Sequence, residues 1–413
     1  MTIFEMKPEK YSPAHENNNL AELVCSNSFR SNALTSGVGL LKEEMRRAGS
    51  LVMDVADKTR VPAGKALAVD RALFAERVTK SLEENRSLDI NRREISKLDD
   101  PALTLYSDVV IAAGPLVSDS LAQDLQSAIG GESLYFYDAI APIISSESLD
   151  WDKVFLASRY DPQSQDYVNC PFSEDEYHVF RRALLEGEKV CLQSFEKIVH
   201  FEGCLPIETL AERGEMTLAF GPLKPVGLVD PKTGKEPFAV VQLRPEDASF
   251  SLLNMVGFQT KLTYSEQVRI FRQIPGLEKA DFKRLGSMHR NTFVNSPSVL
   301  NSSLELKNNP GVFLAGQITG VEGYVESAAC GLWLGMFLTG RQKDMSIPYP
   351  PQETALGSLL HFLRVPKKDF QPMNVNFGLM PPLKKRVKKS RRKEFYAQRA
   401  LDSFNYWLST LPQ

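Results

Sequence analysis

Two continuous apolar runs, far apart in the chain, share the pattern of a buried strand. Val109–Ala113 is apolar throughout and is stopped by Gly114 and Pro115, and the same texture returns at Val312–Ala315 before Gly316. Runs of this length, closed by glycine or proline, are typical of parallel strands buried in an α/β sheet. The pattern predicts an α/β fold in which both ends of the chain contribute to one parallel sheet.

The region between these runs has a different texture. From Tyr135 to about Arg290, short strand-like pieces are separated by Gly, Pro and Asp, as in residues 230–234. This spacing is typical of short strands joined by turns. The middle of the chain is therefore predicted to be a mixed α/β domain inserted into the first one.

Two helical patterns accompany the apolar runs. In Leu40–Arg47, the apolar residues Leu41 and Met45 are four positions apart, with mixed charges between them. Such spacing indicates a helix with one buried face. A second helix is expected over Val325–Leu338, soon after the run that ends at Gly316.

The length of 413 residues exceeds what one compact core usually holds, so two domains are expected. We predict that residues 1–140 and 291–345 form two parts of one domain and that residues 141–290 form the inserted domain. Residues 346–413 are predicted to form a C-terminal helical segment. Hydrophobic residues at 43% and charged residues at 24% are ordinary for a folded protein, which excludes a disordered or collagen-like chain.

The first residues form a candidate strand that ends in an acidic residue, Glu5. In a dinucleotide-binding βαβ unit, the second strand ends in an Asp or Glu that binds a ribose hydroxyl, about 20 residues after a GxGxxG turn. Glu5 has four residues before it, and the chain contains no GxGxxG. If Glu5 has that role, the first strand, the glycine turn and the phosphate-binding helix would lie upstream of Met1. An exposed glutamate at a strand end explains the same pattern more simply.

Glycines follow the second apolar run. Gly316, Gly320 and Gly323 lie between this strand and the expected helix. Such a turn brings backbone N–H groups and the positive end of a helix dipole together, which suits a phosphate or an electron-rich ring edge. A tight turn that requires small residues explains the glycines equally well. Together with the Gly114-Pro115 strand end, the turn favours a two-domain flavoprotein over other α/β classes.

The five cysteines are scattered and lack CxxC spacing, so neither a disulfide framework nor a zinc site is indicated. This usage fits a reducing cytoplasm, and the longest apolar stretch, Ser327–Leu338, is shorter than the roughly 20 residues that span a bilayer. Cys25 and Cys204 lie in loop-like surroundings where a thiolate would be accessible to act as a nucleophile. Cys170, Cys191 and Cys330 are expected to be structural.

Positive charge is concentrated near the C-terminus. The chain has 49 basic and 51 acidic residues, for a formal net charge of -2. Eight of the basic residues lie within ten positions that contain no acidic residue: Lys384, Lys385, Arg386, Lys388, Lys389, Arg391, Arg392 and Lys393. The rest of the chain therefore carries 49 - 8 = 41 positive and 51 negative charges, or -10. Such a cluster favours contact with RNA or DNA phosphates, and a solvated helix face is the alternative.

Three further polar residues are weaker candidates. His289 and Arg290 could contact an anion or carry a proton, although a structural histidine at a domain junction explains the pair as well. Lys224, between Gly221 and Pro225, could face a bound ring system or lie in solvent.

Several strings together resemble the folate- and FAD-dependent tRNA uracil-5-methyltransferases known as TrmFO, which are related to the MnmG/GidA flavoproteins. The resemblance covers essentially the whole chain and rests on these segments: Pro13–His15, Leu23–Arg30, Leu40–Arg47, Val61–Gly64, Phe201–Glu208, Phe220–Leu228, Met288–Phe293, Ala315–Ser327, Phe370–Asn374 and the basic C-terminal run. These strings are far more specific than a lone glycine motif.

The resemblance implies a fold and a reaction. The fold would be a Rossmann-type, glutathione-reductase-like FAD-binding domain with an inserted mixed α/β domain. The methylene group of 5,10-methylenetetrahydrofolate would pass to C5 of the T-loop uridine (position 54) of tRNA and be reduced to methyl, with FAD re-reduced by NAD(P)H. The expected partner is tRNA in the cytoplasm, with no membrane, no metal and no obligate protein partner.

The resemblance also assigns roles to residues. Cys204 is the candidate nucleophile that adds to C6 of uracil, and Cys25 is the candidate general base or second thiol, with the order of the two roles left open. Glu5 matches the ribose-binding acid. Six further residues match the flavin contacts of the family: Gly316, Gln317, Gly320, Val321, Glu322 and Gly323.

One departure concerns the N-terminus. Members of the family have a strand and a Gly-rich FAD-binding turn before the position of Glu5, and this sequence starts after them. We therefore expect the chain to be an N-terminally truncated reading of its gene that binds FAD poorly. Two alternatives stay open: the same chemistry on a ribosomal RNA uridine, and an RNA-binding remnant without redox activity.

Overall fold

The computed structural model describes residues 1–12, 14–130, 134–159, 161, 163–190, 205–368 and 370–412, without the side chains of residues 134–138, 289 and 290. The strands are β1 Thr2–Phe4, β2 Ser28–Ser31, β3 Arg60–Val61, β4 Ala66–Val69, β5 Asp89–Asn91, β6 Val109–Ile111, β7 Leu134–Ala139, β8 Ile143–Ser145, β9 Phe155–Leu156, β10 Val168–Phe172, β11 Ala239–Pro245, β12 Leu252–Met255, β13 Phe282–Arg284, β14 Met288–Phe293 and β15 Val312–Leu314. The helices are α1 Gly37–Arg47, α2 Leu51–Lys58, α3 Arg71–Glu83, α4 Asp119–Ile129, α5 Glu174–Glu186, α6 Ile207–Glu212, α7 Thr217–Phe220, α8 Tyr264–Phe271, α9 Ser296–Val299, α10 Tyr324–Gln342, α11 Ala355–Phe362 and α12 Arg392–Ser409.

The two apolar runs singled out in the sequence lie side by side. β6 pairs with β15 in parallel, with Val110 opposite Phe313, in a two-stranded sheet of their own. β1 pairs with β5, also in parallel. Parallel strands supplied by distant parts of the chain are typical of a Rossmann-type sheet.

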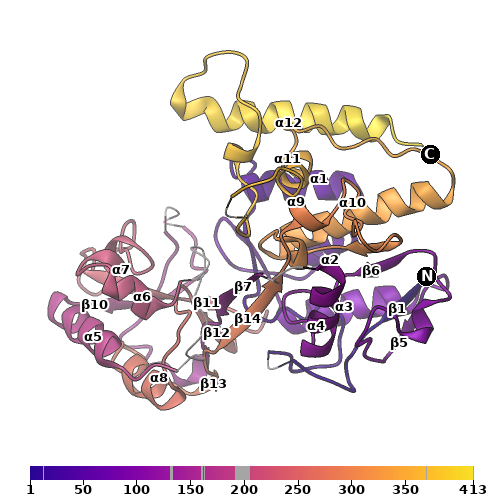
Figure 1. The fold of residues 1–413 in the computed structure, drawn as a ribbon. Coiled ribbons are helices and arrows are strands. Elements are labelled where there is room, and N and C mark those ends of the chain that lie inside the picture. The colour runs from indigo at the N-terminus through magenta and orange to yellow at the C-terminus, as the bar shows by residue number, and fades with distance from the viewer. Residues whose placement is uncertain are drawn as a thin grey trace.

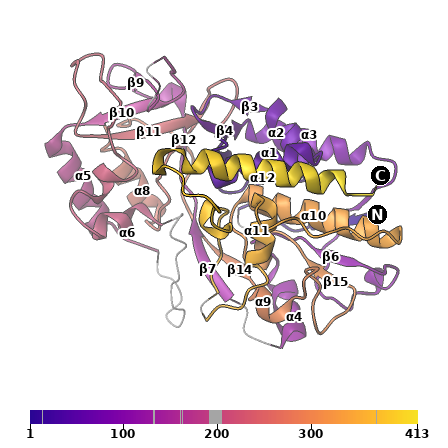
Figure 2. The ribbon, with the colours of Figure 1, turned by 90° about the horizontal axis from the view of Figure 1, so that it is seen from above.

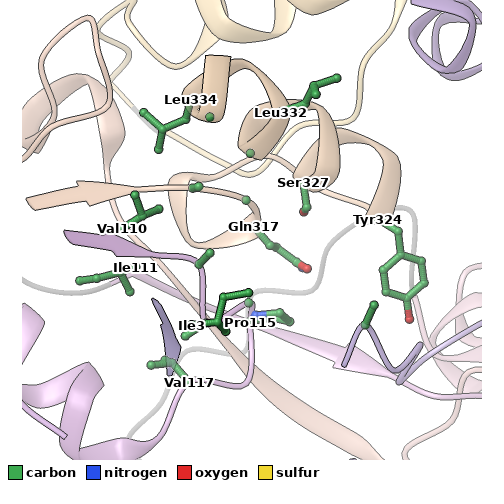
Figure 3. A pocket seen from close by; sticks show the side chains of 18 of the residues that line it. Ile3, Val110, Ile111, Pro115, Val117, Gln317, Tyr324, Ser327, Leu332 and Leu334 are labelled. Carbon is green, nitrogen blue, oxygen red and sulfur yellow. The ribbon is translucent and has the colours of Figure 1, made fainter. Parts of the chain in front are cut away.

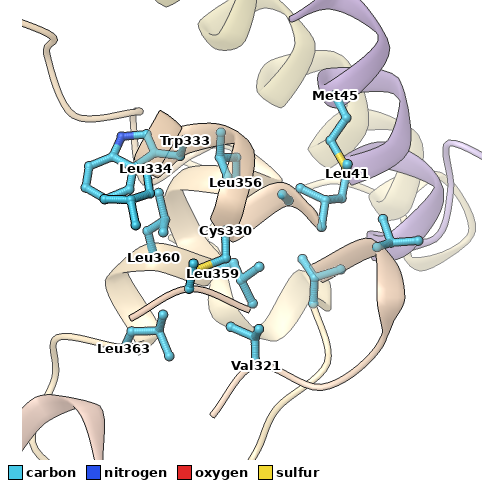
Figure 4. Packing of buried hydrophobic residues seen from close by; sticks show 14 of the residues in the cluster. Leu41, Met45, Val321, Cys330, Trp333, Leu334, Leu356, Leu359, Leu360 and Leu363 are labelled. Atoms are coloured by element: carbon cyan, nitrogen blue, oxygen red, sulfur yellow. The ribbon is translucent and has the colours of Figure 1, made fainter. Parts of the chain in front are cut away.

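A first hydrophobic cluster includes Ile111 of β6 and Phe313 and Leu314 of β15 and extends into the C-terminal helices. It contains residues of α1, α2, α3, α4, α10, α11 and α12. Leu41 and Met45 of α1 contribute to it, as their four-residue spacing predicts, and lie on one side of Leu356 of α11, with Trp333 of α10 on the other side (Figure 4). The long helix α12 lies across this helical layer (Figures 1 and 2) and buries Phe404 and Trp407 against it.

The middle of the chain forms a second hydrophobic cluster around an antiparallel sheet. The six strands run in the order β13-β8-β12-β11-β10-β9, and β11 is buried along its whole length. Helices α5 to α8 pack with this sheet, and Phe172, Phe180 and Phe258 are buried among them. The antiparallel ribbon of β7 and β14 joins this unit to the first one (Figure 1).

The buried cysteines follow the sequence prediction. Cys170 on β10 and Cys330 on α10 are fully buried, one in each cluster. Burial raises the pKa of the Cys170 thiol and raises that of Cys330 to about 11, so both stay protonated at neutral pH. Cys191 lies outside the described residues. No helix in the described part of the chain is long and apolar enough to cross a membrane.

A buried carboxyl group connects the N-terminal and C-terminal parts of the first cluster. Glu44 of α1 is fully buried and accepts hydrogen bonds of 2.8 Å from the backbone N–H groups of Ala355 and Leu356. These donors belong to the first turn of α11, where N–H groups lack helical acceptors. Burial is the strongest influence on the group and raises the pKa of Glu44 to about 8, although the two N–H groups act in the opposite direction.

The raised pKa of Glu44 predicts a pH-dependent stability. Between about pH 4.5 and 8, the folded protein holds a proton on this carboxyl that the unfolded chain releases. The free energy of unfolding should therefore fall as pH rises through this window, by about 1 kcal/mol per pH unit in its middle. Glu44→Gln should remove this slope and cost about 1–3 kcal/mol at low pH, because one N–H loses its acceptor. Urea unfolding at pH 5, 6, 7 and 8 measures both effects.

The matched control is the neighbouring residue Glu43. Its carboxylate is partly exposed and pairs with Arg47 at 3.0 Å on the surface of α1. Glu43→Gln should leave the pH slope in place and change stability by less than about 0.5 kcal/mol. An identical pH slope in wild type and Glu44→Gln would show that Glu44 does not titrate in this window.

Candidate functional site

A cavity of about 1900 Å³ opens beside the two parallel strand pairs and α10, with Arg244 of β11 also lining it (Figure 3). Its walls include β1, β6, the turn after β15 and the loop that carries Cys25. In the described part of the chain, the β1–β5 and β6–β15 pairs form separate two-stranded sheets, and residues of both β1 and β6 line the cavity. Val110 of β6 is consequently 41% exposed, more than expected for a central strand.

The turn after β15 depends on glycine at three positions. Gly316, Gly320 and Gly323 have φ angles of 80°, 90° and 106°, which residues with a side chain rarely adopt. Gly316 and Gly323 line the cavity together with Gln317 and Glu322. The amide of Gln317 donates to Glu322 at 2.7 Å, so these two side chains fix each other at the start of α10.

Two of the predicted flavin contacts lie on the other side of this turn. A side chain at Gly320 would collide with the ring of Phe370, and Val321 is fully buried in the first cluster (Figure 4). Neither residue lines the cavity as described. The flavin contacts expected of these two residues stay a prediction.

Glu5 lies at the end of β1 and borders the cavity. Its backbone N–H donates to Asn91 of β5 at 3.0 Å, and its Oε1 accepts from the N–H of Lys7 at 2.9 Å. These bonds fix the carboxylate at the carboxyl end of a parallel strand, where ligands of α/β sheets bind. The position agrees with the ribose-binding role that the resemblance implies, and the role itself stays a prediction.

Cys25 borders the same cavity and is held by a residue 299 positions away. The backbone N–H of Cys25 donates to the hydroxyl of Tyr324 at 2.9 Å, and this hydroxyl donates to the Cys25 sulfur at 3.1 Å. Tyr324 is the first residue of α10. Burial, above all, raises the pKa of Tyr324 well above its ordinary value, so the hydroxyl keeps its proton for the thiol at neutral pH.

An ion pair supports the wall beside Cys25. Arg30, which lines the cavity, pairs with Glu326, whose side chain is fully buried and also accepts from the N–H of Val375 at 3.0 Å. Beneath it, the ammonium of Lys42 donates to the backbone carbonyls of Phe29 and Arg30 at 2.9 and 3.0 Å. Burial and the neighbouring guanidinium groups lower the pKa of Lys42 to about 7. The backbone around Arg30 is thus anchored from below as well as from α10.

Four of the other predicted residues cannot be placed at the site. Cys204 lies outside the described residues, as do the side chains of His289 and Arg290 on β14. Lys224 does not appear among the residues that line the cavity.

Comparisons with known proteins agree with this geometry. Residues 3–346 match the family described as glucose inhibited division protein A. The chain is 61% identical over 412 residues to a protein of Oleidesulfovibrio alaskensis named methylenetetrahydrofolate–tRNA-(uracil-5-)-methyltransferase TrmFO, covering 100% of this chain and 92% of that protein. It is 58% identical over 411 residues to the protein of the same name from Nitratidesulfovibrio vulgaris, covering 99% and 86%.

The chain belongs to the glucose inhibited division protein A family. Its identity to the two relatives over nearly its whole length places it with the TrmFO proteins of that family, which confirms the resemblance found in the short strings. Two crystal structures of GidA from Aquifex aeolicus share the fold, with TM-scores of 0.68 and 0.63 at 15% identity. They cover 98% of this chain and 69% and 71% of the GidA chains. The predicted Rossmann-type fold is thereby confirmed.

The residues around the cavity agree with the demands of a flavin dinucleotide. Typical ligand pockets measure roughly 300–1,000 Å³, and the cavity of about 1900 Å³ exceeds that range. Glu5 offers a carboxylate at a strand end, and Gly316 and Gly323 let backbone approach the cavity without a side chain in the way. Gly114, at the end of β6, has φ 69° and open space where a Cβ would point.

The hydrogen bonds between Tyr324 and Cys25 give a testable consequence for stability. Tyr324→Phe removes the acceptor of the Cys25 N–H and the donor to the sulfur. The free energy of unfolding should fall by about 1–3 kcal/mol, because the two hydrogen bonds between Tyr324 and Cys25 are lost. Urea unfolding followed by circular dichroism measures the change.

Tyr106 is the matched control for this substitution. Its hydroxyl donates to Thr2 at 2.7 Å in an exposed pair. Tyr106→Phe should change stability by less than about 0.5 kcal/mol, since water replaces the lost partner. Equal losses in the two variants would argue against a structural role for the Tyr324 hydroxyl.

Proposed function

We propose that this protein transfers the methylene group of 5,10-methylenetetrahydrofolate to C5 of the T-loop uridine (position 54) of tRNA and reduces it to methyl. The observation that carries the proposal is identity of 54–61% over 98–100% of the chain to proteins named for this reaction, from eight bacterial strains. When bound, FAD supplies the redox chemistry, with NAD(P)H as the source of reducing equivalents.

The chemistry of uracil explains why two ionisable groups are needed. C5 becomes nucleophilic when a thiolate adds to C6, and a base must then remove the proton from C5. Cys204 is the proposed nucleophile and Cys25 the proposed base, with the reverse order open. The position of Cys25 at the cavity, with a proton-bearing tyrosine hydroxyl 3.1 Å from its sulfur, supports a role in catalysis.

Within the same proposal, the cofactor lies along the strand ends that border the cavity. Glu5 binds the ribose, and Gly316, Gln317, Glu322 and Gly323 contact the flavin. Residues 1–140 and 291–345 form the flavin-binding domain, residues 141–290 the inserted domain and residues 346–413 the C-terminal segment. We propose a cytoplasmic location, in line with thiols that are not arranged as a disulfide framework.

The basic segment, residues 384–393, is proposed to bind tRNA phosphates. All eight cationic side chains are exposed, and six of them precede α12, two of these in the short 3-10 helix Lys389–Arg391. Arg392 and Lys393 occupy the first turn of α12, where positive charge opposes the helix dipole. A phosphate near this turn would relieve that repulsion, which supports the proposal.

The function is tested by measuring 5-methyluridine in tRNA. The chain is expressed in a bacterial strain whose tRNA lacks this nucleoside, and the nucleosides are analysed by mass spectrometry. Wild type should restore 5-methyluridine in the T-loop, and Cys25→Ala should reduce the rate by roughly 100-fold or more, as expected for loss of a general base. Cys170→Ala, at a buried thiol in the second cluster, should retain the activity.

Failure of the wild-type chain to form 5-methyluridine in tRNA would contradict the proposed function, and its appearance in ribosomal RNA alone would reassign the substrate. The nucleophile is tested separately with 5-fluorouridine RNA, which stays covalently bound to the attacking thiol. Cys204→Ala should abolish this adduct. An undiminished adduct would exclude Cys204 as the nucleophile.

The basic segment gives an independent prediction. Replacing Lys384, Lys385, Lys388 and Lys389 by Ala should weaken tRNA binding and reduce the slope of log Kd against log salt by roughly one per lost phosphate contact. Replacing the exposed Lys232 and Lys235 of the second unit should leave the slope unchanged. Filter binding between 50 and 300 mM salt measures the slope, and equal slopes in wild type and the fourfold variant would remove the segment from the RNA interface.

A further inference from the structure

Two guanidinium groups hold the loop that carries Cys25. Arg71, the first residue of α3, donates from Nη1 to the backbone carbonyl of Leu23. Arg244 of β11 donates from Nη2 to the hydroxyl of Ser26 at 2.9 Å and from Nε to Asn27 at 3.0 Å. The residues immediately around Cys25 are therefore fixed from two sides by cations.

The two cations come from different parts of the fold. α3 belongs to the first hydrophobic cluster and β11 is a central strand of the second. Asn27 lies between the two parts, since its amide donates to the carbonyls of Val69 and Pro245, both at 2.9 Å. Arg71 is linked to Glu246, two residues beyond Arg244, by an ion pair of 2.8 Å. The loop of Cys25 thus lies where the two clusters meet.

The charges at this junction do not cancel. In the contacts described, one carboxylate, that of Glu246, faces two guanidinium groups. Arg244 is 6% exposed, and Nη2 of Arg71 is buried without a hydrogen-bond partner among the described residues. Both arginines interact electrostatically with Cys25, and Tyr324 donates to the sulfur from α10. A buried excess of positive charge next to a thiol favours its thiolate.

We propose that Arg71 and Arg244 are positioning residues that fix the Cys25 loop and stabilise the thiolate of Cys25, and that Arg244 brings this charge from the second unit. The inference rests on the catalytic role proposed for Cys25. It adds the two side chains that hold the Cys25 loop in place and favour the thiolate form. Because Arg244 is carried by β11, the reactivity of the thiol depends on contact between the two units. If Arg71 and Arg244 only held the loop in place, neutral hydrogen-bond donors would be sufficient. Burying a positive charge without a matching carboxylate costs free energy.

The test reads the thiol directly and needs no RNA, folate or flavin. The rate of alkylation of Cys25 by iodoacetamide is measured from pH 6 to 10 by mass spectrometry of the peptide that contains it. In Arg244→Met, the midpoint of the pH profile should rise by about one unit, and the rate at pH 7 should fall about tenfold. In Glu246→Gln the midpoint should move in the opposite direction, because the carboxylate is removed and both cations stay.

Two further variants separate charge from folding. Arg244→Lys keeps the positive charge but cannot make the hydrogen bonds to both Ser26 and Asn27. The midpoint of its pH profile should therefore lie closer to wild type than that of Arg244→Met. Arg272→Met removes a guanidinium that donates to the carbonyl of Ala280 at 2.9 Å in the second unit, and it should leave the Cys25 profile unchanged.

A faster alkylation of Arg244→Met with an unchanged midpoint would overturn the proposal, since it would indicate loosening of the loop alone. Equal shifts in Arg244→Met and Arg272→Met, or shifts of the same sign in Arg244→Met and Glu246→Gln, would overturn it as well. The alkylation assay is independent of the methylation assay. If the midpoint shifts as expected but the protein forms no 5-methyluridine, the proposed function is contradicted and the role of the two arginines is still supported.

Discussion

The pair of hydrogen bonds between Tyr324 and Cys25 is the constraint on which the rest of the site depends. It ties a loop near the N-terminus to the first residue of α10, directly after the glycine turn that borders the cavity. The turn requires glycine at three positions because their φ angles are rarely adopted by other residues, and the side chains of Gln317 and Glu322 hold each other. The thiol, the turn and the strand ends therefore form one wall of the cavity, and the ion pair of Arg30 with Glu326 adds a second contact to the same helix.

Local patterns predicted the scaffold well because its elements are defined by short-range periodicity. The runs at β6 and β15 contain almost nothing but apolar residues, and α1 shows its buried positions at four-residue spacing. The polar residues of α1 were not predictable in this way. Lys42 and Glu44 look like part of a mixed, solvated helix surface, yet both are fully buried, because one binds the carbonyls beneath Arg30 and the other the first turn of α11. Only the distant segments that supply these partners explain the burial.

In the candidate site, too, some residues could be predicted from the sequence and others could not. Glu5, Cys25 and four of the six turn residues border the cavity, which is compatible with the roles that the resemblance implies, and those roles stay predictions. Sequence alone could not separate Gly320 and Val321 from their neighbours, since one step around a turn changes the direction a residue faces. It also could not find Arg71 or Arg244, because no local signal marks an arginine whose partner loop lies 48 or 217 positions away in the chain.

Hydrophobic burial and polar contacts have different tasks in this molecule. Each cluster has its own apolar core, so neither needs the buried charges at the junction for its stability, and desolvating those charges opposes folding. Two buried arginines that face one carboxylate contribute little to the stability of the contact between the two units. The same arrangement is effective for a thiol that must ionise, since positive charge acts strongly where water is excluded. The electrostatic cost at the junction is thus best explained by the chemistry of the residue it surrounds, Cys25.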